Sequence, residues 1–483
     1  MINKIYYRIL EMGAIQRQSL LMIGSQFFTA FFGFFSIIYF AKVLGASDLG
    51  IYFLFITYFG LISTVIDFGF GKAAIKRISE KVEANEYFSA FVVVRIISVT
   101  IIVLLLLIFK DYFFVLNQNG TYLWLIIILI VSILSGITLN SVAGLGKIGI
   151  IATTMSFENI CRMIIQVIAV YLGFSLFGMI GGFTLGLLLG ALLQLKFLNL
   201  KLVRFKFKHI KNLSTFSFWE FLISGSIITF QSIDTILIGH YLQPADVGIY
   251  RIGLQLSGFL YIITSSLCST LYIRVSRWSI TGETNLIEES LSKGMTYSLL
   301  IIIPFVAGGI LLGKDILYTL YGAEFASGYL TFVVLLISQI IIVFFTFFSS
   351  YLSALDKQKD LFKFMLLSVI VNIILNIILI PIFGIIGAAI AIAINMILCS
   401  LMFGNLLSKT IKIKIDNSIV SIIKSTIIMS IFIGIYCKIF PTQNLYFILP
   451  VIIGIIVYFV SIFILDQKIY NEIKTYIIYR GIQ

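Results

Sequence analysis

Apolar runs of about twenty residues recur along almost the whole chain, from residue 19 to residue 465. A helix needs about twenty apolar residues to cross the hydrocarbon core of a bilayer, whereas the strands of a membrane barrel give shorter, alternating segments. Only 11% of the 483 residues are charged, too few to wet the surface of a soluble protein of this size. The sequence therefore predicts an all-α integral membrane protein with about fourteen transmembrane helices. The expected spans are 19–41, 49–70, 88–109, 122–143, 151–173, 175–198, 215–240, 246–273, 294–313, 326–352, 361–382, 384–407, 419–440 and 444–465.

The Lys and Arg residues lie mainly in alternate loops. If the N-terminus is cytoplasmic, 27 of the 34 basic residues fall in cytoplasmic segments, four fall on the opposite side and three lie inside spans. Basic residues are enriched in the cytoplasmic loops of membrane proteins, so both termini are expected in the cytoplasm. The net charge of +13 needs no nucleic-acid partner, because the charge is scattered over short loops instead of forming one patch.

An internal repeat divides the chain. LGASDLGIYFLF, from Leu44 to Phe55, is similar to LQPADVGIYRIG, from Leu242 to Gly253, at an offset of 198 residues. A second pair, FGMIGGFTLG and FGIIGAAIAI, recurs at an offset of 206. Parallel repeats about an axis along the membrane normal are a transporter architecture, with the substrate cavity between the halves. We expect six-helix bundles at 1–198 and 199–407 with pseudo-two-fold symmetry, and two additional helices with a cytoplasmic tail at 408–483.

The residues that usually hold metals or perform catalysis are sparse. The four cysteines are far apart in apolar runs, and the two histidines, His209 and His240, are isolated. No phosphate-binding GxxxxGK[ST] loop is present. A membrane enzyme such as a glycan polymerase or acyltransferase would need sizeable outer loops or a His-containing site, and the longest expected outer loops have only about a dozen residues. We therefore expect no cofactor, no metal and no enzymatic activity.

Four segments carry a resemblance to a known family. They are LGASDLGIY, IDFGFGKAAIKRISE, VGIYRIGLQLSGFLY and NIILNIILIPIFGIIGAAIA. With the arrangement of six, six and two spans, the whole chain resembles the polysaccharide (O-antigen) flippases of the multidrug/oligosaccharidyl-lipid/polysaccharide exporter superfamily. These motifs mark the superfamily well and the substrate poorly.

The resemblance implies a function in O-antigen or capsule export and lipopolysaccharide biosynthesis. It implies that two bundles rock around a central cavity in the bacterial cytoplasmic (inner) membrane. They would move an undecaprenyl-pyrophosphate-linked oligosaccharide to the periplasmic leaflet, coupled to a proton or sodium gradient. The expected partners are the lipid-linked substrate, membrane lipids, a glycan polymerase and a chain-length regulator, with the flippase itself acting as a monomer.

Seven charged side chains are expected inside spans or at their ends, where ionisable groups usually face protein or water. Arg162, Arg251 and Arg95 are the candidates for substrate binding, because the Arg fork matches phosphate oxygens. Glu158 and Arg162, four residues apart near mid-span, share one helix face and can pair. In a functional role, Arg162 would attract the pyrophosphate or an acidic sugar, and Glu158 would be its counter-charge or the ion-coupling group. The alternative is that the two residues form a structural ion pair.

Each of the other charged residues can likewise have either a functional or a structural role. Arg251 and Arg95 can line the cavity or extend to the nearest membrane surface. Asp234 is a second candidate for ion coupling, or part of an interhelical hydrogen-bond cluster with Gln231 and Thr235. Asp67 and Glu220, near cytoplasmic ends, are expected to have gating or structural roles, pairing with Lys72 or Arg204.

Two other functions stay open within the same superfamily, a multidrug exporter and a lipid II exporter. The three Arg and no Lys inside spans favour an anionic head group over the cationic drugs that multidrug exporters usually carry. The identity of the sugar, the coupling ion and its stoichiometry do not follow from the sequence.

Overall fold

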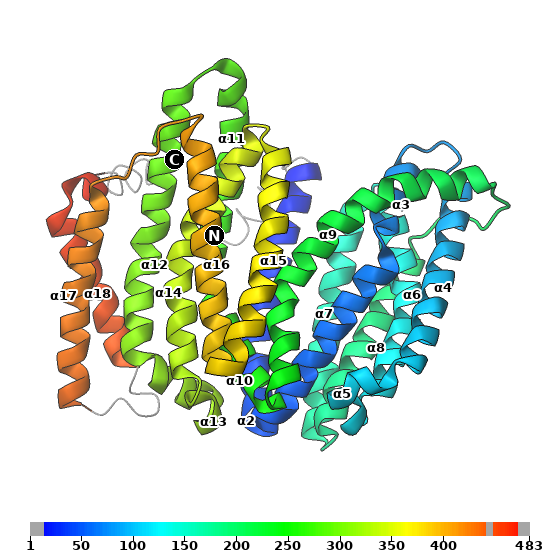
Figure 1. The fold of residues 1–483 in the computed structure, drawn as a ribbon, viewed down its shortest axis with the longest axis horizontal. Helices are drawn as coiled ribbons and strands as arrows, with labels where there is room; N and C mark the ends of the chain where they lie inside the picture. Colours follow the sequence, from blue (N-terminus) through cyan, green and yellow to red (C-terminus); the bar gives the residue numbers. More distant parts are fainter. Residues whose placement is uncertain (1–13, 441–447, 472–483) are drawn as a thin grey trace, which may run out of the picture. The chain divides into compact units, whose positions relative to one another are not determined.

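The computed structural model describes residues 14–440 and 448–471, and every regular element in these two ranges is helical. Figure 1 shows the long helices running roughly parallel within each half of the chain. By compactness the chain forms two units, an N-terminal unit at 1–239 and a C-terminal unit at 240–483. This grouping is a different property from the sequence repeat, so the division into 1–198, 199–407 and 408–483 stays a prediction.

The N-terminal unit contains nine of the elements in the described residues. They are α2 (Ala14–Asp67), α3 (Phe70–Ser79), α4 (Ala84–Ile108), a 3-10 turn η1 (Lys110–Phe113), α5 (Phe114–Gln118), α6 (Tyr122–Gly144), α7 (Ile148–Tyr171), α8 (Ser175–Leu195) and most of α9 (Phe207–Tyr241).

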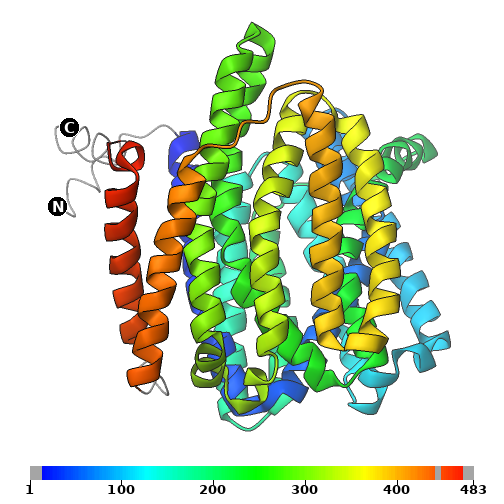
Figure 2. The same cartoon turned by 60° about the vertical axis from the view of Figure 1, so that its left-hand side comes forward.

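The C-terminal unit contains the remaining helices. They are α10 (Pro244–Gly258), α11 (Tyr261–Thr281), α12 (Thr284–Tyr321), α13 (Ala323–Ala326), α14 (Tyr329–Ala354), α15 (Gln358–Phe383), α16 (Ile385–Ser408), α17 (Ser418–Ile439) and α18 (Ile448–Leu465). Figure 2 shows α17 and α18 as a pair beside α12, and Tyr458 of α18 donates a hydrogen bond to the carbonyl of Leu300 at 2.7 Å.

Twelve helices of the described residues are long and apolar enough to cross a membrane, and the bent pair α10 and α11 adds a thirteenth span. The first of the twelve, α2, is interrupted at Gly45, whose φ of 76° and ψ of −177° are not helical. Glycine adopts this conformation without a Cβ penalty. Counting the two parts of α2 separately gives the fourteen expected spans, so the prediction of an all-α membrane protein with about fourteen helices is confirmed.

The α7–α8 hairpin is the part of the fold that positions the candidate site. The two helices are joined by a tight turn through Gly173, which has a φ of 91°. α8 presents a glycine every fourth residue toward α7, at Gly178, Gly182, Gly186 and Gly190. Small residues at this spacing let two membrane helices approach closely. Long polar side chains of α7 therefore lie directly against the backbone of α8.

Candidate functional site

One face of α7 is polar over three turns of the helix. Thr154, Glu158, Arg162 and Gln166 follow one another at intervals of four residues, which places them on the same face. Thr154 and Gln166 are buried, while Glu158 and Arg162 are half-buried. The face extends for about 18 Å at 1.5 Å per residue, more than half of the thickness of a hydrocarbon core.

The glycines of α8 lie opposite this polar face. A Cβ added at Gly182 would lie 2.6 Å from Cγ of Gln166, and one at Gly186 would lie 2.7 Å from Cβ of Arg162. A Cβ added at Gly190 would lie 2.6 Å from Oε2 of Glu158. Real Cβ atoms do not approach other atoms this closely, so larger residues at these positions would displace either α7 or its side chains.

Hydrogen bonds hold both ends of the polar face. Gln166, only 4% exposed, donates from Nε2 to the hydroxyl of Tyr52 on α2 at 2.9 Å and to the carbonyl of Met179 at 2.7 Å. At the other end, Gln194 of α8 donates to Thr154 at 3.2 Å and accepts from Thr138 of α6 at 2.9 Å. Glu158 and Arg162 therefore lie between two groups of hydrogen-bonded polar side chains.

Arg162 lies against an aromatic side chain. Its guanidinium carbon is 5.4 Å from the ring centroid of Phe183 on α8, within the range of a cation–π contact. Phe183 itself packs edge-to-face against Phe59 of α2, with centroids 5.7 Å apart.

Arg95 and Asp67 form the most buried ion pair of the N-terminal unit. Nη1 of Arg95 is 3.1 Å from Oδ1 of Asp67, and Nη2 donates to the carbonyl of Ser132 at 3.3 Å. Oδ2 of Asp67 accepts from the backbone N–H of Gly71 at 3.2 Å, at the start of α3. Arg95 is 6% exposed. The pair lies at the break between α2 and α3. The direct ion-pair partner of Asp67 is Arg95, and neither of the expected partners, Lys72 and Arg204, takes that place.

Glu220 of α9 pairs with Lys72 of α3 and accepts a hydrogen bond from Ser224 at 3.0 Å. Lys72 is one of the two expected partners. Beside this pair, Phe68 stacks on Phe221 with ring centroids 4.3 Å apart. These contacts join the start of α3 to α9.

Asp234 lies on α9 and is 3% exposed, with Oδ1 accepting from the backbone N–H of Thr235 at 2.8 Å. Of its expected polar neighbours, Thr235 is buried and Gln231 is exposed. Arg251 lies on α10 and is half-buried, with Gln255 exposed one turn further. Asp234 belongs to the N-terminal unit and Arg251 to the C-terminal unit.

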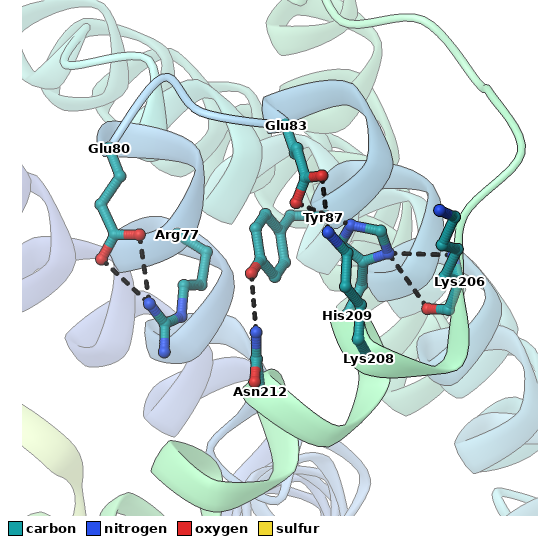
Figure 3. A network of polar contacts seen from close by, with 8 residues as sticks. All are labelled: Arg77, Glu80, Glu83, Tyr87, Lys206, Lys208, His209 and Asn212. Carbon is teal, nitrogen blue, oxygen red and sulfur yellow. Dashed lines mark hydrogen bonds and ion pairs between the residues drawn. The ribbon is translucent and has the colours of Figure 1, made fainter.

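A polar network that the sequence did not predict ties the start of α9 to the α3–α4 turn (Figure 3). Glu83 contacts Nζ of Lys208 at 2.7 Å and Nε2 of His209 at 3.1 Å. The ring of Tyr87 lies edge-on to His209, and its hydroxyl accepts from Asn212 at 3.0 Å. Hydrogen bonds from Lys208 and His209 hold the pKa of the Glu83 carboxyl below its ordinary value.

The candidate site consists of charged, amide, hydroxyl and aromatic side chains on α7, α8 and α2. Among the described residues, no group of three His, Cys, Asp or Glu side chains can hold a metal ion. The candidate residues Glu158 and Arg162 share a helix face, as expected from their spacing. Tyr52, Phe183, Gln166 and Gln194, which complete their surroundings, were not predicted.

The fold and these intramembrane charges define a multi-pass membrane protein with a transporter architecture. A family model described as "Polysaccharide biosynthesis protein" matches residues 15–279, more than half of the chain, and a MatE model matches residues 223–378. The chain therefore belongs to the polysaccharide biosynthesis protein family, within the exporter superfamily that its motifs indicated.

Two relatives come from Haloferax volcanii. The "probable low-salt glycan biosynthesis flippase Agl15" is 26% identical over 315 residues, 64% of this chain and 66% of the relative. The "probable flippase AglR" is 26% identical over 100 residues, 21% of each chain. The chain thus aligns with just under two thirds of the length of the first and about a fifth of the second.

Two solved structures share the fold. The lipid II flippase MurJ in an inward closed conformation superposes with a TM-score of 0.76 at 19% identity, covering 93% of this chain and 100% of that one. An inward-facing multidrug resistance MATE family transporter of the MOP superfamily superposes with a TM-score of 0.64 at 13% identity, covering 79% and 96%. At these identities the likeness establishes the fold.

Proposed function

We propose that the protein is a flippase that moves a polyprenyl-pyrophosphate-linked oligosaccharide across the membrane by alternating access, and that it is a transporter and not an enzyme. The observation that carries this proposal is the polar face of α7, where Glu158 and Arg162 lie inside a span of a polysaccharide-family member. Its relatives Agl15 and AglR are described as flippases, which supports the same activity here.

The substrate we propose is an O-antigen or capsular repeat unit on undecaprenyl pyrophosphate. A pyrophosphate brings negative charge into a medium of low dielectric, where uncompensated charge is expensive. A fixed guanidinium lowers that barrier and donates parallel hydrogen bonds to phosphate oxygens. Arg162 is the first candidate, and Arg251 and Arg95 are the next. We also propose coupling to a proton or sodium gradient through Glu158 or Asp234, and function as a monomer in contact with a polymerase and chain-length regulator.

The orientation we propose has both termini in the cytoplasm of a bacterial cell, with the inner membrane as its location. The two terminal tails lie outside the described residues, so the proposal rests on the basic residues of the loops. Reporter fusions after residues 45, 115, 245 and 320 should all report the periplasm. Cytoplasmic signals from any two of these fusions would contradict the orientation.

Deletion of the protein should leave its lipid-linked substrate in the cytoplasmic leaflet while synthesis of that substrate continues. The measurement is the amount and leaflet of the lipid-linked oligosaccharide in the deletion strain, with and without a plasmid copy of the protein. If the lipid-linked unit is no longer made, the protein is a synthase. Accumulation of lipid II in its place would assign the protein to the lipid II exporters instead.

A further inference from the structure

Glu158 and Arg162 are close in sequence and their charges attract each other, yet they form no direct salt bridge. Glu and Arg four residues apart on a helix are well placed for an ion pair. Among the ion pairs of residues 14–440 and 448–471, none joins these two side chains within 4.0 Å. The separation is unexpected inside a span, because pairing would offset part of the cost of two charges in the membrane.

Each of the two charges has its own place on α8. The carboxylate of Glu158 lies against Gly190, where an added Cβ would come within 2.6 Å of Oε2. The guanidinium of Arg162 lies over the ring of Phe183, 5.4 Å from its centroid. Gly190 and Phe183 are seven residues apart on α8, about two turns, so the two side chains contact α8 at different levels.

The surrounding structure fixes these two places. Phe183 packs edge-to-face against Phe59 of α2 on one side and lies under the guanidinium of Arg162 on the other. Gly190 is one of four glycines that face α7, and the three atoms nearest to its added Cβ all belong to the Glu158 side chain. Of the other glycines that face α7, Gly186 meets the aliphatic Cβ of Arg162, whereas Gly178 and Gly182 meet Ala169 and Gln166.

We propose that Gly190 and Phe183 are positioning residues that hold Glu158 and Arg162 apart, so that the carboxylate engages a cation and the guanidinium an anionic head group during transport. The inference rests on the proposed function. Without these two residues the side chains would relax toward each other and form an ion pair. A paired Arg162 would have fewer free N–H donors and less net charge to offer a phosphate.

Substitutions at Phe183 test whether its contact with the guanidinium of Arg162 is needed for export. Phe183→Leu should lower surface glycan export about tenfold at unchanged protein level, because the cation–π contact is lost. Phe183→Tyr and Phe183→Trp keep an aromatic face and should retain export. Phe177→Leu, on the exposed side of the same helix, is the matched control and should export normally. Equal export by Phe183→Leu and Phe183→Tyr would overturn the role of Phe183.

A substitution at Gly190 tests whether its contact with the Glu158 side chain is needed for export. Gly190→Ala should reduce export about tenfold. Gly181→Ala on the same helix is the control and should affect export little, because its added Cβ would lie 3.4 Å from the ring of Trp124, an ordinary contact distance. A double-mutant cycle measures the interaction between Glu158 and Arg162 in the same variants. The coupling between Glu158→Gln and Arg162→Gln, measured as the difference between the melting-temperature change of the double variant and the sum of the single changes, should be larger in the Gly190→Ala background than in the wild-type background. Equal coupling in both backgrounds would overturn the inference.

Failure of the inference can be told apart from failure of the proposed function. If Arg162→Ala exports normally, the proposed function loses its site and the inference falls with it. If Arg162→Ala is inactive while Phe183→Leu and Gly190→Ala export at the wild-type rate, the inference alone is wrong. If Gly190→Ala does not reach the membrane, the export measured for the Phe183 variants alone supports or contradicts the inference.

Discussion

Arg162→Ala is expected to reduce surface glycan by about ten- to a hundredfold while the protein remains in the membrane at its normal level. The guanidinium lies on the polar face of α7, over Phe183, in a membrane-spanning helix. A hydrogen bond to a charged group contributes about 1.5–3 kcal/mol, and each 1.4 kcal/mol changes a rate by about tenfold. The measurement is surface glycan per cell, normalised to the amount of the protein in membranes.

Two further substitutions make the test of Arg162 specific. Arg162→Lys should restore part of the export, because the charge survives and the planar fork does not. Arg204→Ala removes an exposed Arg outside the described spans and serves as the control, with export unchanged. Full export by Arg162→Ala at normal protein level would remove Arg162 from the site and leave Arg251 and Arg95 as the candidates.

Breaking the Arg95–Asp67 pair should produce the largest loss of stability. Arg95→Leu leaves the Asp67 carboxylate without its partner at the α2–α3 break, and removing one member of a buried pair costs about 3–5 kcal/mol. The variant should therefore melt well below the wild type in detergent and accumulate less in membranes. The double variant Arg95→Leu with Asp67→Asn should recover part of the loss, because no unpaired charge remains.

The Lys72–Glu220 pair is the control for this prediction. It joins the same region of α3 to α9, but Lys72 is 60% exposed, and exposed ion pairs contribute about 0–1 kcal/mol. Lys72→Leu should therefore change the melting temperature little. A loss of stability in Lys72→Leu as large as that in Arg95→Leu would contradict the structural role of the buried pair.

The sequence predicted the helices well because a membrane span is a local property of about twenty residues. It also separated the two parts of α2 near Gly45, since charged and small residues interrupt the apolar run there. The bend between α10 and α11 was not predicted, because the run 246–273 reads as one continuous span in the sequence and its 44° change of direction depends on packing.

The site was predictable only where it is local. The spacing of Glu158 and Arg162 placed them on one face of α7, as the structure confirms. The pairing of Arg95 with Asp67, 28 residues away, depends on how α2 and α4 pack, which the sequence alone does not specify. His209 was isolated in sequence, and only the fold brings it to Glu83, 126 residues away. The close approach of Gly182 to Gln166 likewise depends on how α8 packs on α7.

Transbilayer movement in a purified system tests the central claim most directly. The protein is reconstituted into liposomes with a fluorescent undecaprenyl-pyrophosphate-linked oligosaccharide, and the fraction open to a membrane-impermeant quencher is followed under imposed proton or sodium gradients. The account predicts that the wild-type protein carries the labelled lipid to the opposite leaflet and that Arg162→Ala does not. Movement no faster than in protein-free liposomes, under either gradient and with a stably folded protein, would contradict it.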